Sequence, residues 1–213
     1  MKKLLSVAAA LCMSVTLVAC GAGGSTVDKN EEAAKEVVNS FFTALQSGDI
    51  EKAQSFANET VTDELGKITG AFDEFNTLLD QYNATDETRA KYTSIMPLII
   101  KAVFEKYEIT ETEKVSDTAY SFQVKNTGVN LDAIEHVDAA LDQDAFIEDI
   151  TDELTEKAQS DGYDAAMSWL MDKLADYMLE SLNTYIADQA REENVMNCVV
   201  EKVDDKWLVT KMQ

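Results

Sequence analysis

One histidine and its acidic neighbours are the residues whose types could bind a metal ion. His136 lies in a short acidic stretch, where Glu135, Asp138 or Asp142 could join it as ligands. His136 and Asp138 are two positions apart, so they do not share a helix face. A surface histidine on an acidic helix explains the pattern better. We therefore predict no metal ion and no cofactor at this place.

Two acidic segments have some of the side chains of a calcium loop. They are Asp142-Gln143-Asp144 and Asp161-Gly162-Tyr163-Asp164. Neither continues into the calcium-binding pattern, which needs oxygen ligands at fixed positions, a glycine at the sixth and a glutamate at the twelfth. We interpret both as solvated helix ends. The chain also has no nucleophile elbow and no phosphate loop. With a single histidine, the sequence gives little support for a serine–histidine or cysteine–histidine triad.

A cysteine near the N-terminus has the sequence context of a lipid-attachment site. A basic start and an apolar run over residues 2–19, which is too short to span a bilayer comfortably, have the pattern of a secretory signal. The run ends in Leu17-Val18-Ala19-Cys20, which resembles the lipobox of bacterial lipoproteins. The resemblance implies a signal peptide over residues 1–19 and acylation of the Cys20 thiol. An ordinary secretory signal that happens to contain a cysteine is the alternative.

The residues after this cysteine predict a tether. Residues 21–30 are glycine-rich and have no apolar periodicity, so residues 20–30 form a lipidated cysteine and a flexible linker with a reach of about 15–20 Å. Two or more acyl chains hold a protein durably on a membrane. We therefore expect a lipid-anchored protein on the extracytoplasmic face of the cell membrane.

The charge balance limits the partners of the chain. Its 18 basic and 40 acidic side chains give a net charge of −22, and loss of Lys2 and Lys3 with the signal would make it −24. Such a surface repels nucleic acid and anionic lipid headgroups, and it could favour cationic partners. We expect no nucleic-acid partner. The acidic residues are spread along every predicted helix, which is typical of a solvated shell.

One cysteine remains in the body of the chain. Cys12 would leave with the signal and Cys20 would be acylated, so no intramolecular disulfide could form. Cys198 lies in an apolar stretch with no cationic residue nearby in sequence. We predict a buried and inert thiol.

Apolar periodicity predicts one α+β domain over residues 31–213. Helical spacing indicates helices over residues 31–45, 50–58, 63–83 and 86–106, the last interrupted at Pro97. Alternation then predicts a hairpin over residues 107–131, with its turn at Ser116-Asp117. Two further helices follow, over residues 132–159 and 163–192. A second hairpin over residues 195–212 turns at Asp204-Asp205.

Two short motifs resemble a known superfamily. The run Phe41-Phe42-Thr43-Ala44-Leu45-Gln46-Ser47-Gly48-Asp49-Ile50-Glu51-Lys52-Ala53 looks like the opening of domains of the nuclear transport factor two superfamily, also called cystatin-like. The ending Val203-Asp204-Asp205-Lys206-Trp207-Leu208-Val209 looks like their closing hairpin. The whole arrangement is similar to that of a group of Gram-positive lipoproteins. The resemblance implies a curved antiparallel sheet of two hairpins packed on helices, often around a conical cavity. This chain departs from the simple form through a large two-helix insertion between strands, over residues 132–193.

A fold of this kind could hold an acid–base site. Such a site would place a carboxylate opposite a tyrosine inside an apolar cone. Tyr82, Tyr107 and Tyr120 are possible donors, and Asp117 and Asp132 are possible bases. Asp117 sits in a predicted turn and Asp132 begins a predicted helix, so both have structural explanations. We therefore predict no catalytic residue.

Two classes of function follow. The first, which we favour, is a non-catalytic lipoprotein that binds a small ligand or an envelope protein with its cavity or with the helical insertion. The alternative is a cone-pocket enzyme of isomerase or dehydratase type. Met167, Met171 and Met178 suit either an adaptable binding surface or a core. Trp169 and Trp207 are interpreted as core or interface residues.

Overall fold

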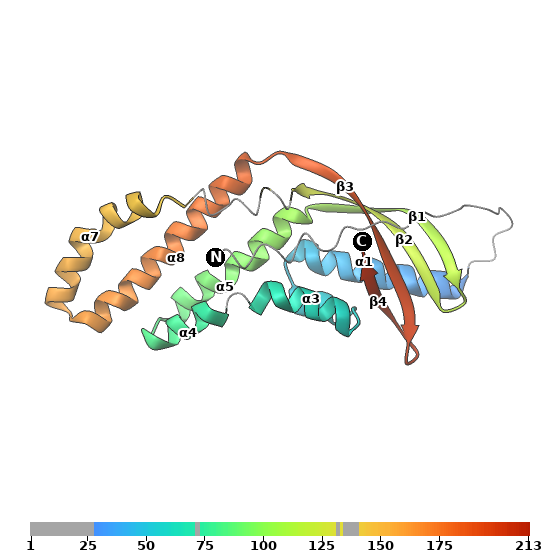
Figure 1. Ribbon diagram of the computed structural model, residues 1–213, viewed down its shortest axis with the longest axis horizontal. Coiled ribbons are helices and arrows are strands. Elements are labelled where there is room, and N and C mark those ends of the chain that lie inside the picture. Colours follow the sequence, from blue (N-terminus) through green and yellow to red (C-terminus); the bar gives the residue numbers. More distant parts are fainter. Residues whose placement is uncertain (1–27, 71–72, 131–132, 134–140) are drawn as a thin grey trace.

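The structure is a computed structural model that describes residues 28–70, 73–130, 133 and 141–213. The predicted signal peptide, Cys20 and most of the tether lie outside the described residues, as do Asp132, Glu135, His136 and Asp138. The predicted α+β class is confirmed. Figure 1 shows the elements, which follow in the order α1 (Lys29–Ser47), α2 (Ile50–Gln54), α3 (Glu59–Gly70), α4 (Asp73–Gln81), α5 (Asp86–Val103), β1 (Lys106–Ser116), β2 (Ala119–Val129), α7 (Gln143–Ser160), α8 (Tyr163–Asp188), β3 (Arg191–Val203) and β4 (Lys206–Met212).

The strands form one open antiparallel sheet in the order β1-β2-β3-β4. Both predicted hairpins are confirmed, but the first turns at residues 117–118 rather than at Ser116-Asp117, because Ser116 pairs with Ala119. Asp204 and Asp205 have φ angles of 47° and 67°, the left-handed values that a tight two-residue hairpin turn requires. Register shifts in β1 and between β3 and β4 mark bulges, which bend a sheet. Figure 1 shows β3 curving on its way from α8 to this turn.

Helix α1 packs against all four strands. Its predicted apolar face is confirmed, because Ala34, Val38, Phe41 and Leu45 are all fully buried. The Asp28 carboxylate caps its first turn by accepting from the Asn30 amide. At its end, Gly48 adopts a φ of 73°.

Three of the helices predicted in the first half of the chain have wrong bounds. The predicted helix over residues 50–58 ends at Gln54, because the backbone of Phe56 and Asn58 hydrogen-bonds with Val209 of β4. Phe56 is only partly buried. Asn58 instead caps α3, and the predicted helix over residues 63–83 consists of α3 and α4. Helix α5 continues through Pro97 and ends at Val103, so Lys106 belongs to β1.

The predicted end of the insertion is also wrong. Helix α8 stops at Asp188, and β3 begins at Arg191, inside the segment predicted to be helical. Arg191 and Glu192 pair with Val129 and Gly128 of β2. Their charged side chains look like a helix surface in the sequence, but pairing with a long neighbouring strand extends the sheet. The part of the insertion that precedes β3 therefore ends at residue 190 rather than 193.

The described residues form two apolar cores that share helix α5. The first lies between the sheet and helices α1, α2 and α3. The second joins α4, α5 and α8 with the end of β2. Met96 and Ile100 of α5 belong to the first core, whereas Tyr92 and Ile95 belong to the second. Helix α5 is therefore the element that holds α8 in place relative to the sheet.

Strand β2 and helix α5 meet very closely where the two cores join. A Cβ atom on Gly128 would lie 2.0 Å from the carbonyl oxygen of Val103. The amide of Asn126 donates to the same carbonyl at 2.8 Å. Arg191 adds to this joint through Glu105 at 2.6 Å and the backbone oxygen of Ile186 at 2.8 Å. The end of α8 is thereby tied to the turn between α5 and β1.

Candidate functional site

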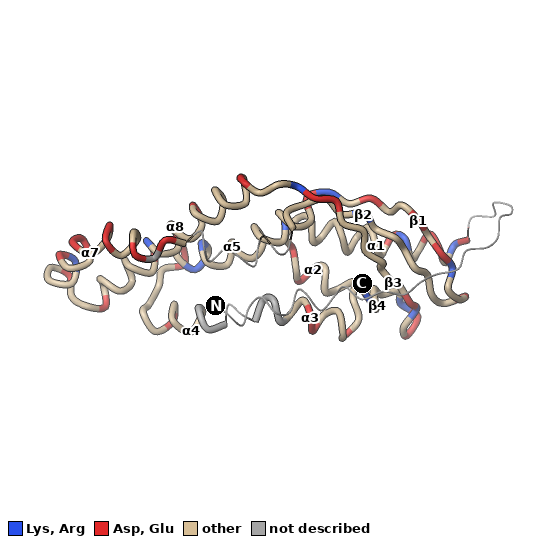
Figure 2. Tube along the Cα trace, turned by 45° about the horizontal axis from the view of Figure 1, so that its top comes forward, with Lys and Arg blue, Asp and Glu red and all other residues tan. Residues whose placement is uncertain are grey.

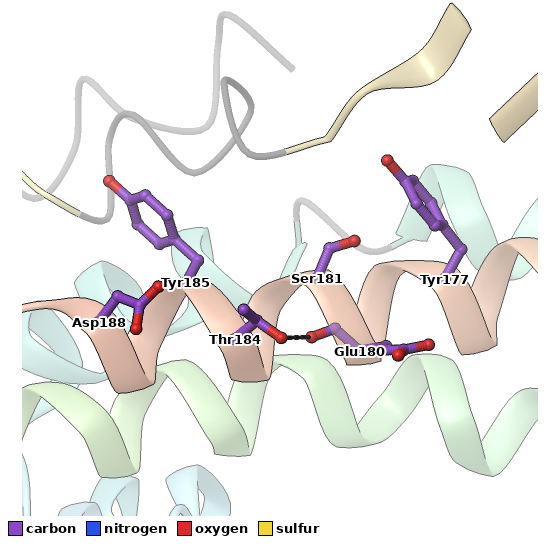
Figure 3. Close-up of a pocket in the computed structure, with 6 residues that line it drawn as sticks. All are labelled: Tyr177, Glu180, Ser181, Thr184, Tyr185 and Asp188. Carbon is purple, nitrogen blue, oxygen red and sulfur yellow. Dashed lines mark hydrogen bonds between the residues drawn. The ribbon is translucent and has the colours of Figure 1, made fainter. Parts of the chain in front are cut away.

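Helix α8 carries a groove on the side that does not face the second core. The groove has a volume of about 510 Å³. The groove is lined by Tyr177, Glu180, Ser181, Thr184, Tyr185 and Asp188. Figure 3 shows Tyr177, Ser181 and Tyr185 pointing from α8 away from the green ribbon of α5, whereas Glu180, Thr184 and Asp188 lie across the face of α8.

These six residues form two parallel rows at four-residue spacing, which places the members of each row on one helix face. One row is Tyr177, Ser181 and Tyr185, with a tyrosine at each end. In the other row, Glu180 and Asp188 lie at the ends and Thr184 between them. Eight residues of helix separate the two carboxylates by about 12 Å along the axis. The groove thus combines hydroxyls, aromatic rings and two spaced negative charges.

The tyrosine hydroxyls already have backbone partners. Tyr185 donates to the carbonyl oxygen of Ala133 at 2.7 Å, and Tyr177 donates to that of Asp142 at 3.0 Å. The ring of Tyr177 also stacks on Phe146, with 4.7 Å between centroids. The Thr184 hydroxyl donates to the backbone oxygen of Glu180 at 2.9 Å. What the tyrosines offer a ligand is therefore their ring surface rather than their hydroxyls.

The two carboxylates of the groove lack a direct ion pair with any described residue. Within the described part of the chain, neither Glu180 nor Asp188 forms an ion pair. Figure 2 shows further acidic residues along the neighbouring helix α7. The only ion pair of α7 among the described residues joins Lys157 to Asp161 at 2.9 Å. The groove therefore lies in a region of net negative charge, which attracts cations.

A polar cluster fixes α8 on α5. Lys91 contacts Asp172 at 2.9 Å and Asp176 at 2.8 Å, and the buried Thr88 donates to Asp172 at 2.8 Å. Burial raises the pKa of the Asp172 carboxyl, but the hydrogen bonds from Lys91 and Thr88 outweigh burial and lower it overall. Burial raises the pKa of Tyr92 to about 12, and Asp172 adds to this shift. Because these charges are satisfied within the cluster, its role is structural.

The described acid–base candidates do not converge on one cavity. Tyr107 donates to the Asn39 carbonyl at 3.0 Å, and Tyr82 packs on the second core. The Asp117 side chain is 94% exposed and pairs with Lys114 in the turn, as a turn residue would. Tyr120 donates to Asp28 at 2.7 Å. The helix-facing side of the sheet is packed by fully buried side chains, among them Phe122, Val124, Val200 and Val209.

The contact between Tyr120 and Asp28 was not predicted from the sequence. The hydrogen bond from Tyr120 lowers the pKa of the Asp28 carboxyl, aided by the Asn30 amide and by Lys114. Burial raises the pKa of Tyr120 to about 12, and the Asp28 hydrogen bond contributes. The contact ties the first turn of α1 to the sheet.

The other predicted residues have structural positions. Asp142 caps α7 through the Ala145 amide, and Asp161 ends that helix, which confirms both segments as helix ends. The single helix predicted over residues 132–159 is wrong, because residues 141 and 142 are not helical and α7 begins only at Gln143, after its Asp142 cap. Cys198 is fully buried, and burial raises the pKa of its thiol to about 12, as expected for an inert cysteine.

The tryptophans and methionines singled out in the sequence lie mostly in or on the two cores. Trp207 packs on the first core and Met171 lies in the second. Met178 packs partly buried against the second core, Met167 is partly buried in α8, and Trp169 lies beneath the ammonium of Lys173.

Neither a metal cluster nor a membrane span is found in the described ranges. No three histidine, cysteine or carboxylate side chains described in the structure come close enough together to hold a metal ion. The predicted candidates around His136 lie outside those residues, so that hypothesis stays open. No described helix has the length and apolar character needed to cross a membrane.

Comparison with known proteins gives no relative for this chain. No family model, no curated protein and no solved structure matches it. The resemblance to the nuclear transport factor two superfamily and to bacterial lipoproteins therefore stays a prediction.

Proposed function

We propose that the protein is a lipoprotein, anchored through Cys20 on the extracytoplasmic face of the cell membrane, that acts as a non-catalytic binding module. The lipobox-like segment before Cys20 supports the anchor. The groove and the acidic surface of α7 and α8 support the binding role. In this proposal the sheet and α1 form a domain of the nuclear transport factor two type. The open antiparallel sheet covered by α1 supports that assignment.

The ligand of the groove carries positive charge. Two carboxylates support this, because Glu180 and Asp188 lie about 12 Å apart along α8 and neither forms an ion pair with a described residue. Ring faces of Tyr177 and Tyr185 border the groove and can contact the alkyl stem or the charge of an organic cation. An extended organic amine with charges near its two ends fits this arrangement.

A titration with spermidine, followed by calorimetry at low and at physiological salt, tests the binding role. The double variant Glu180→Gln/Asp188→Asn should bind it at least about tenfold more weakly, since two charge-assisted contacts are lost. The matched control is Asp152→Asn/Glu156→Gln, which removes the same charge from the exposed face of α7. Equal weakening in both double variants would show only attraction to a negative surface and would contradict a specific site.

Cell fractionation tests the anchor separately. Wild-type protein should stay with the envelope after a high-salt wash, and the Cys20→Ser variant should appear in the soluble fraction. Intact-mass analysis of the wild type should show an acylated Cys20 as the first residue. A Cys20→Ser variant that remains with the washed envelope would contradict lipid anchoring.

A further inference from the structure

The N-terminus of the described chain is fixed at one end of the molecule. At the start of α1, the Asn30 side chain donates to the Asp117 carbonyl at 3.4 Å, and Asp28 contacts both Lys114 and Tyr120. Asp117 lies in the turn between β1 and β2. We call this region, formed by Asp28, Asn30 and residues 114–118, the β1–β2 end.

Helix α1 and helix α8 lead away from the β1–β2 end. Helix α1 has 19 residues and measures about 28 Å. Near its far end, Gln46 donates to the Glu105 carbonyl at 2.7 Å, and Glu105 binds Arg191 at the start of β3. From there, α8 extends for 26 residues, about 39 Å, to the turn at residues 160–163, which we call the α7–α8 tip. Figure 1 shows the β1–β2 end and the α7–α8 tip at opposite extremes of an elongated molecule.

We propose that the β1–β2 end faces the lipid bilayer and that the α7–α8 tip points away from it. This inference rests on the proposed acylation of Cys20. Seven residues lie between Cys20 and Asp28, so the eight steps from one Cα atom to the next span at most about 28 Å when the chain is fully extended. That reach is shorter than α8 alone. The anchor therefore keeps the β1–β2 end near the membrane, while the groove on α8 lies further out.

Electrostatics opposes a protein that lies flat on the membrane. The chain carries a net charge of −22, and removal of Lys2 and Lys3 with the signal makes the anchored form still more negative. Anionic headgroups repel such a surface. Figure 2 shows acidic residues along α7 and α8, so tilting this part toward the bilayer would bring carboxylates against phosphates. An upright orientation reduces that repulsion, and it exposes the α8 groove to cationic molecules in the surrounding medium.

Energy transfer from the protein to acceptor lipids measures this orientation. The full-length lipidated protein is reconstituted into vesicles that contain a rhodamine lipid, and a donor dye is attached at Ser116→Cys or at Ser160→Cys. Both serines are exposed, one at the β1–β2 end and one at the α7–α8 tip. The native Cys198 is fully buried and does not compete for the dye. Transfer from position 116 should be at least about twofold greater than from position 160. Equal transfer, or greater transfer from position 160, would overturn the proposed orientation.

A second matched pair guards against a local effect of one substitution. Thr118→Cys lies at the β1–β2 end, and Thr155→Cys lies in α7 about 8 Å along the helix from the α7–α8 tip; both positions are exposed and should reproduce the difference. The difference should also grow when phosphatidylglycerol replaces part of the phosphatidylcholine in the vesicles, because anionic lipid repels the acidic tip. A difference of the opposite sign in the second pair would overturn the proposal.

Labelling of the wild-type protein separates failure of the orientation from failure of the anchor. If Cys20 is acylated, a maleimide dye finds no accessible thiol in the folded wild-type chain, since Cys198 is buried. Incorporation of dye at Cys20 would refute the proposed lipidation, and with it the basis for any orientation. If the wild type takes up no dye and the labelled Ser116→Cys and Ser160→Cys variants show equal transfer, the orientation alone would be refuted.

Discussion

The sheet region and the α7–α8 region differ in how their side chains are buried. In the first core, Phe41, Phe42 and Tyr120 are fully buried, and the two phenylalanines meet edge to face at 5.4 Å. In α7, by contrast, Ile150 is the buried residue among those described, and Ile147 is 57% exposed. Helix α7 packs on α8, and α8 packs on α5. The sheet region can therefore fold around its own core, whereas α7 depends on one neighbouring helix.

This difference separates the scaffold from the surface that we propose for binding. A closely packed core tolerates few substitutions. A helix pair that buries few apolar side chains tolerates substitutions over most of its exposed surface. The contacts of Gly128 and Arg191, which we call the joint, fix the position of α8 relative to the sheet. Substitutions in four places test this division, beginning with the joint itself.

The largest effect is expected at the joint. Gly128→Ala would place a Cβ atom 2.0 Å from the Val103 carbonyl oxygen, so β2 and α5 would have to separate. We expect a loss of about 4 kcal/mol or more in the free energy of unfolding, or no folded protein, measured by urea denaturation. Gly66→Ala is the control, since its nearest atom would be 3.9 Å away and alanine favours a helix by roughly 0.5–1 kcal/mol. Comparable losses in both variants would contradict a specific close contact.

Shortening a buried side chain should destabilise the whole protein in the sheet region but only α7 in the α7–α8 region. Phe41→Ala should cost about 3–5 kcal/mol of global stability, because it empties the centre of the first core. Ile150→Ala should cost less and act locally, since it loosens α7 from α8. Hydrogen exchange read by mass spectrometry should show faster exchange in α7 alone for Ile150→Ala. Faster exchange throughout the sheet in that variant would show that the two regions do not fold independently.

Loss of the α5–α8 ion cluster should have an intermediate effect. Lys91→Met leaves Asp172 and Asp176 without their shared ammonium, and a cost of about 1–3 kcal/mol is expected. Lys125→Met removes an ion pair with Glu193 on the outer side of the sheet and should cost below about 1 kcal/mol. Thermal denaturation compares the two variants. A larger loss for Lys125→Met than for Lys91→Met would contradict the view that the α5–α8 cluster contributes more stability than the ion pair on the sheet.

The smallest effect is expected at the start of α1 and should depend on pH. The Tyr120 hydrogen bond lowers the folded-state pKa of Asp28. A carboxyl whose folded pKa is lowered adds stability above its unfolded pKa, near 3.9, and that stability disappears as pH falls through the folded value. Tyr120→Phe should therefore lower stability at pH 7 and lose less than the wild type on acidification below about pH 4. Urea midpoints from pH 7 to pH 3 measure the difference. Parallel curves would show that this contact does not set the Asp28 pKa.

Local patterns in the sequence determined much of the scaffold. The spacing of Ala34, Val38, Phe41 and Leu45 predicted the buried face of α1, because side chains three and four apart share a helix face. Asp204 and Asp205 predicted the last hairpin, since aspartate tolerates a positive φ. The two rows of the α8 groove also follow helical spacing. Their carboxylates could have been recognised from that spacing.

Only the tertiary structure decided the features that join distant segments. Tyr120 and Asp28 are 92 positions apart, and Tyr185 reaches Ala133 over 52 positions, so no local pattern reveals either contact. Arg191 and Glu192 have helix-compatible side chains, but hydrogen bonds to β2 place them in a strand. Likewise, β4 ends the helix after Gln54 by pairing with the following residues. The physical reason is that a backbone N–H or C=O group in these segments can hydrogen-bond either within a helix or with a neighbouring strand, and the packing of the sheet places the strand partner within reach.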